Sequence, residues 1–102
     1  MAIELNTNNE DELTRFDGLK FRVKGDSMSP RIMPGDILVV EKNIINFKQI
    51  TVVGYGGKIM ARRVEDLGNG EYILVPENPD YPSIRTSAVH FFGSVVAVIR
   101  SG

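Results

Sequence analysis

The chain has 102 residues, a formal net charge of −1, no cysteine and one histidine. A chain of this length forms one domain around a single hydrophobic core. Without cysteine there are no disulfides, no thiolate catalysis and no cysteine-based zinc sites, and one histidine is too few for a histidine-rich metal site. We therefore expect neither a metal nor another cofactor. The near-neutral charge gives no overall attraction for nucleic acid or for an anionic membrane.

No apolar run is long enough to cross a membrane, and the first residues lack a signal-peptide pattern. These features predict a cytoplasmic protein of bacterial or phage type that makes no contact with a membrane. Residues 1–17 are polar and acidic, which predicts an N-terminal arm with little capacity to bury surface. Residues 18–102 would then form the folded domain.

The first strand patterns begin after this arm. Leu19–Lys24 alternates apolar and basic side chains, which is the period of a half-buried strand. Ile37–Val40 and Ile50–Val53 are short, β-branched runs typical of buried strands. The glycine-rich stretch 54–57 then predicts a tight hairpin into the next strand.

The second half of the chain continues the pattern. Lys58–Val64 and Glu71–Val75 are predicted strands, while the two prolines of Asn78–Ser83 make that segment a loop. The apolar stretches Val89–Phe92 and Gly93–Arg100 close the chain, and no segment has sustained helical periodicity. Six or more short strands predict an all-β fold, a single partly closed, barrel-like assembly in which most neighbours are antiparallel.

Turn signals cluster around one serine in residues 25–36. Gly25 and Asp26 precede Ser27 and Pro30 follows it, which favours a sharp change of chain direction. A serine at such a bend is lifted off the sheet beside free backbone amides, as a nucleophile and its oxyanion require. A polar loop between two strands explains the same residues, and turn chemistry alone favours that simpler interpretation.

The segment 25–30, followed by Pro34-Gly35-Asp36 and an apolar strand, resembles the LexA-like peptidase family. This family contains the self-cleaving repressors, the UmuD-type proteins and, more distantly, the signal peptidases. The similarity continues in later strands up to residue 100. It implies that Ser27 occupies the nucleophile position and that Asp26, Met28 and Pro30 belong to the substrate and oxyanion segment.

The resemblance also implies a general base on the strand Lys58–Val64. Family members carry there a lysine that burial keeps neutral, because desolvation lowers its pKa. In this chain the matching position is Arg62, followed by Arg63. A guanidinium group is always protonated and cannot accept the serine proton. We therefore predict that Ser27 is a poor nucleophile.

No other residue of the sequence is a convincing replacement base. Lys58 shares a strand face with Arg62 but lies four residues away, about 13 Å along an extended strand. Lys24 and Lys42 end strands and are more simply solvated charges. His90 lies in an apolar stretch, where a packed or capping imidazole is the better interpretation.

The resemblance implies two partners: an extended peptide segment in a groove beside Ser27, and a second copy of the chain. Phe91, Phe92, Val95 and Val96 are the predicted homodimer region, since exposed aromatics are enriched at interfaces. Alternatively, the two aromatics fill the core. DNA would be bound only through a helix-turn-helix module that this sequence lacks, and no Ala-Gly or Cys-Gly bond is present for self-cleavage.

Three functions therefore remain open from the sequence. The first is the LexA-like domain of a repressor-type transcriptional regulator, weak or inactive in self-cleavage and acting in dimerisation and peptide binding. The second is an active serine peptidase of the Ser/Lys type, either signal-peptidase-like or acting in trans. The third is a small β-barrel interaction module in which the segment around Ser27 is merely a turn.

Overall fold

The computed structural model describes residues 3–6 and 19–100. These residues form eight strands and no helix, which confirms the predicted all-β class. The strands are β1 (Ile3–Asn6), β2 (Leu19–Arg22), β3 (Ile37–Lys42), β4 (Thr51–Tyr55), β5 (Lys58–Gly68), β6 (Glu71–Val75), β7 (Ile84–Thr86) and β8 (His90–Arg100). In the described ranges no helix is long and apolar enough to cross a membrane.

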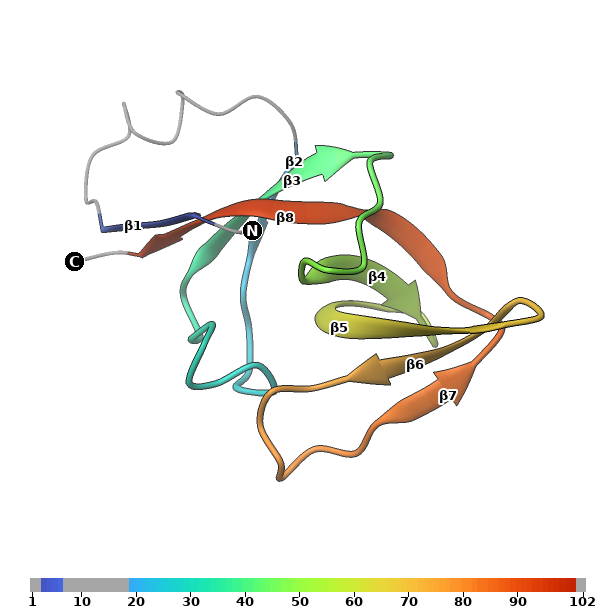
Figure 1. Ribbon diagram of the computed structural model, residues 1–102. Helices are drawn as coiled ribbons and strands as arrows, with labels where there is room; N and C mark the ends of the chain where they lie inside the picture. The colour runs from blue at the N-terminus through green and yellow to red at the C-terminus, as the bar shows by residue number, and fades with distance from the viewer. Residues whose placement is uncertain (1–2, 7–18, 101–102) are drawn as a thin grey trace.

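The strands form one strongly curved sheet in the order β2-β3-β8-β4-β5-β6-β7 (Figure 1). Every neighbouring pair along this path is antiparallel. The outer strands β2 and β7 do not pair with each other, so the sheet curves round without closing. The predicted partly closed, barrel-like assembly is therefore confirmed.

Strand β8 lies at the centre of the sheet. It is one continuous strand where the sequence pattern indicates two apolar stretches, Val89–Phe92 and Gly93–Arg100. It pairs with β3 along one edge, and with β4 and then β1 along the other. The register shifts between Val39 and Val40 and again between Val52 and Val53, which are bulges that bend the strand. Partners on both edges keep the strand continuous through these bends.

Gly93 allows β3 and β4 to approach β8 closely at the same point. It is the register partner of both Lys42 and Val52. A Cβ atom at this position would lie 2.7 Å from Val40 Cγ1 and closer still to the carbonyl oxygen of Glu41. Any side chain here would therefore push the backbone of β3 away.

Of the four predicted dimer residues, Val95 is buried and Phe91, Phe92 and Val96 are partly buried. Phe91 packs against Phe47 and Tyr72, with ring centroids 5.2 and 4.9 Å apart. Phe92 packs against Phe21 at 6.0 Å, and Val95 is fully buried. Val95 is thus not available on the surface. Phe91, Phe92 and Val96 are partly buried, and a homodimer through these three residues stays a prediction.

Part of the predicted N-terminal arm is a strand. The backbone of β1 runs parallel to the end of β8, in a register that matches Ile3 to Ala97 and Asn6 to Arg100. The remainder of the arm lies outside the described residues. The division into an arm (1–17) and a domain (18–102) stays a prediction.

Candidate functional site

The serine turn connects β2 to β3 and is anchored on both sides of Ser27. Met28 and Ile32 are buried in the main core cluster, and the amide of Ile32 donates to the carbonyl of Met28 at 3.0 Å. The amide of Ser29 donates to the carbonyl of Asp26, also at 3.0 Å. These contacts fix the bend, so the Ser27 side chain projects from a rigid support.

Asp36 closes the same turn. Its carboxylate accepts a hydrogen bond from the amide of Met33 at 2.9 Å and lies 3.3 Å from Nε of Arg100. The carboxylate is almost fully buried, so the partly buried arginine compensates for its charge. Asp36 thus caps a backbone amide within this turn.

The loop between β6 and β7 clamps the serine turn from the other side. The Asn78 amide donates to the Ser27 carbonyl at 2.9 Å, and its side-chain nitrogen donates to the Asp26 carbonyl at 3.0 Å. The Tyr81 hydroxyl donates to the Asp26 carboxylate at 2.5 Å. Tyr81 was not singled out as a site residue from the sequence.

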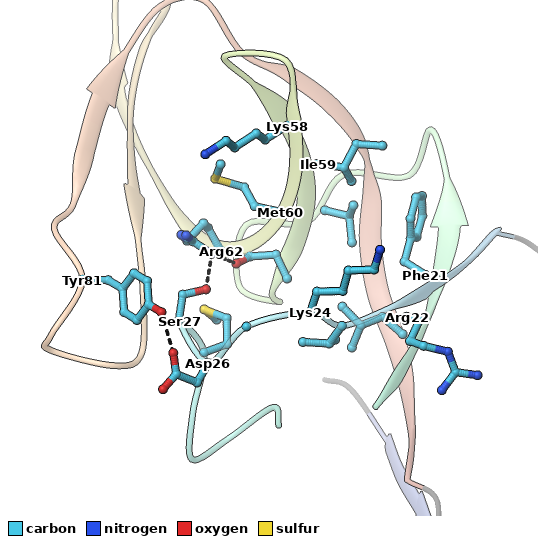
Figure 2. A pocket seen from close by; sticks show the side chains of 16 residues that line it. Phe21, Arg22, Lys24, Asp26, Ser27, Lys58, Ile59, Met60, Arg62 and Tyr81 are labelled. Atoms are coloured by element: carbon cyan, nitrogen blue, oxygen red, sulfur yellow. Dashed lines mark hydrogen bonds between the residues drawn. The ribbon is translucent and has the colours of Figure 1, made fainter. Parts of the chain in front are cut away.

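Arg62 reaches the serine from β5, as Figure 2 shows. Its Nη1 atom donates to Ser27 Oγ at 2.8 Å and to the carbonyl of Ala61 at 2.7 Å. The arginine is only 8% exposed. The structure therefore brings together the two residues that the resemblance places at the nucleophile and base positions, and the serine oxygen accepts a hydrogen bond from a cation.

Burial lowers the pKa of Arg62, and the nearby Tyr81 raises it by a smaller amount. A guanidinium starts from so high a pKa that it stays charged near neutral pH. It has no lone pair available to take the Ser27 proton. The arrangement is suited to binding the serine oxygen and unsuited to general-base catalysis.

A cavity of about 400 Å³ extends from Ser27 between two strand edges. One wall is formed by Phe21–Met28 and the other by Lys58–Arg62. In the described structure β2 pairs only with β3, Lys58–Arg62 pairs only with β4, and β6 joins β5 only from Arg63 onward. Both walls thus present backbone groups that no described strand pairs.

The other predicted residues divide into those that line this cavity and those that do not. Asp26, Met28, Lys24 and Lys58 line it together with Ser27 and Arg62. Pro30 is exposed and does not line it, so its predicted place in the substrate segment is not reflected in the cavity. Two residues considered as replacement bases also lie outside the cavity lining. They are Lys42, at the end of β3, and His90, whose ring packs edge-to-face on Phe92 at 4.7 Å.

Within residues 19–100, no three His, Cys, Asp or Glu side chains are grouped so that they could hold a metal ion.

The Tyr81–Asp26 contact leads to a pH prediction. The hydrogen bond to Asp26, followed by the charge of that carboxylate, raises the pKa of the Tyr81 phenol. Because the folded-state pKa is raised, the contact contributes stability below the ordinary phenol pKa of about 10 and loses it as the pH rises through the folded-state value. Asp26→Asn should lower the pKa of Tyr81, which is measurable by NMR titration of the ring resonances.

Asp80→Asn is the matched control, because Asp80 is an exposed carboxylate of the same loop. Its removal should leave the pKa of Tyr81 nearly unchanged. If Asp26→Asn moves the Tyr81 titration no further than Asp80→Asn does, the clamp between the loop and the serine turn is contradicted.

Comparison with known proteins identifies the family of this chain. Residues 7–96 match the family model described as Peptidase S24-like, and the chain belongs to this family. Among curated proteins, it is 39% identical over 93 residues to a LexA repressor of Delftia acidovorans and 34% identical over 83 residues to a LexA repressor of Carboxydothermus hydrogenoformans. The alignments cover 86% and 78% of this chain, but only 41% of each relative. The LexA-like resemblance is thereby confirmed.

Proposed function

We propose that this chain is the LexA-like domain of a repressor-type transcriptional regulator, and that it binds an extended peptide segment beside Ser27 with little or no cleavage. The observation that carries the proposal is the 2.8 Å hydrogen bond from Arg62 Nη1 to Ser27 Oγ. In this proposal Arg62 holds the base position, where a Ser/Lys peptidase needs a neutral amine and a permanent cation cannot accept the serine proton. Similarity to two LexA repressors supports the regulatory role.

Strand addition is the binding mode that fits the cavity walls. An extended peptide can hydrogen-bond to the unpaired edge of β2, to the unpaired edge of Lys58–Arg62, or to both. Alternate peptide side chains would then point toward the apolar Phe21, Leu38 and Val52, which also line the cavity. The peptide would complete the barrel that the sheet leaves open.

NMR titration of the isotope-labelled chain with an extended peptide tests this function. We expect saturable shifts of the backbone amides of Lys58–Arg62 and Leu19–Arg22, with the peptide intact at the end. Ile84–Thr86 of β7 form the other outer edge of the sheet and provide an internal control that should not shift. Equal shifts at β7 would contradict binding in the cavity, and a cleaved peptide would favour the alternative, an active Ser/Lys-type peptidase.

We also propose that two copies of the chain associate near the C-terminal strand β8. Pairing of β8 within the chain limits how the second copy can bind. The backbone of Ala97–Arg100 pairs with β1 on one edge, and β8 pairs with β3 on the other. A second copy would therefore have to displace β1 or dock on a face of the sheet. Contact with DNA would need a module that the described residues do not contain.

Removal of residues 1–6 tests the role of β1. Because the deletion exposes the β8 edge beside Ala97–Arg100, we expect the shortened chain to dimerise at lower concentration than the full chain. Sedimentation velocity over a concentration series measures this difference. If both chains sediment identically at every concentration, β1 does not control that edge.

A further inference from the structure

The cavity beside Ser27 is basic, although the chain as a whole is not. Four of its lining residues are cations: Arg22, Lys24, Lys58 and Arg62. The lining contains one carboxylate, that of Asp26, which accepts the hydrogen bond from Tyr81. The lining therefore has more cationic than anionic side chains, whereas the net charge of the chain is −1. A concave site of one sign attracts ligands of the opposite sign.

Arg62 is the innermost of these cations, and within residues 19–100 it has no charged partner. Its two acceptors are neutral oxygens, those of Ser27 and Ala61. Its Nε atom is buried without a hydrogen-bond partner. No carboxylate within residues 19–100 lies at ion-pair distance from its guanidinium. A buried cation in this condition is unfavourable unless an anion reaches it.

Arg62, Ser27 and the backbone of the serine turn carry hydrogen-bond donors that the described residues leave available. The guanidinium is planar, and Nε and Nη2 form an edge that matches the two oxygens of a carboxylate. Since Ser27 Oγ accepts from Nη1, the serine hydroxyl hydrogen is itself free to be donated. Among the described residues, the backbone amides of Ser27 and Met28 have no acceptor. All these groups favour a ligand with negatively charged oxygens.

We propose that Arg62 and Ser27 form a receptor for a carboxylate of the bound peptide, either its C-terminal carboxylate or that of an acidic side chain. This inference rests on the proposed function, because it names the ligand of the same cavity. The apolar Phe21, Leu38 and Val52 in the lining favour a peptide over a free inorganic anion. Arg62, which stands at the position of the family's general-base lysine, would thus bind an anion instead of accepting a proton.

The experiment is calorimetric titration with one extended neutral peptide in three forms: with a free C-terminal carboxylate, with a C-terminal amide, and with the amide plus an internal glutamate. Inorganic phosphate alone is the fourth ligand. We expect at least one carboxylate form to bind about tenfold to a hundredfold more tightly than the neutral amide form. The form that gains affinity identifies the source of the carboxylate.

Two variants locate the effect. Arg62→Met should abolish the preference, so that the carboxylate and amide forms bind this variant with equal affinity. Arg63→Met is the matched control: it removes the same charge one residue along the strand, from a side chain that is 59% exposed and lies beside Glu77, and it should keep the preference. If Arg62→Met does not fold, the Nε–H resonance of Arg62 in the unmodified chain decides, since it should shift with the carboxylate peptide and not with the amide.

The outcomes separate this inference from the proposed function. Equal affinity for all three peptides overturns the carboxylate receptor and leaves peptide binding intact. Phosphate binding as tight as that of the best peptide also overturns it, because the site would then be a general anion site. If no form of the peptide binds, both the receptor and the proposed function are wrong.

Discussion

The Arg62→Lys variant is expected to cleave a supplied peptide containing an Ala-Gly bond at least about 100-fold faster than the unmodified chain, since a positioned general base contributes roughly 10²–10⁴-fold. The burial that lowers the pKa of Arg62 would act on the lysine as well. A lysine with a lowered pKa is partly neutral and can accept the Ser27 proton, which a guanidinium cannot. Mass spectrometry of the peptide over time measures the rate.

Two control variants isolate the base. Arg62→Met also loses the guanidinium but gains no amine, so it should remain as slow as the unmodified chain. Adding Ser27→Ala to Arg62→Lys should abolish the gained activity, because the nucleophile is then absent. If folded Arg62→Lys is no faster than Arg62→Met, position 62 is not the base position in this chain.

Gly93→Ala is expected to lower the free energy of unfolding by about 3 kcal/mol or more, a large part of the roughly 5–15 kcal/mol typical of a domain. The new Cβ would meet backbone atoms of Glu41, which belong to the paired strand β3 and cannot move away alone. Relief would require separating β3 from β8, which form the centre of the sheet. Chemical denaturation followed by circular dichroism gives the value.

Gly54→Ala is the matched control, since Gly54 lies on the adjacent strand β4. A Cβ there would come 3.2 Å from Cε2 of Phe92, a side-chain atom that can shift by a few tenths of an ångström. We expect a loss of about 1 kcal/mol, at the low end for overpacking. Equal losses for the two variants would contradict the close approach of β3 to Gly93.

The strands could be predicted because their signals are local. Alternation in Leu19–Lys24 and the β-branched run at Ile37–Val40 correspond to β2 and β3. The join between Val89–Phe92 and Gly93–Arg100 could not be predicted in this way. It depends on β3, β4 and β1 pairing along both edges of β8, and those strands are distant in sequence. In the sequence Gly93 separates the two apolar stretches, but in the structure it allows β3 and β4 to pair closely with β8.

The candidate site also contains residues that could be predicted from the sequence and residues that could not. Residues 27 and 62 could be matched because each lies in a recognisable segment, and the structure places their side chains in contact. The contact of Tyr81 with Asp26 was missed, because a proline-rich loop carries no signal for where it packs. The basic lining was also missed: Lys24 and Lys58 converge only when the sheet curves. A net charge of −1 hides such a local concentration.

Reaction of the unmodified chain with a serine-directed phosphonate tests the central claim most directly, because that reagent reports whether the Ser27 hydroxyl is activated. Intact-protein mass spectrometry after prolonged incubation near neutral pH should show no adduct, since Arg62 donates to Ser27 Oγ and cannot take its proton. A stoichiometric adduct located on Ser27 would contradict the account, because a base would then have to act on that serine despite the guanidinium beside it.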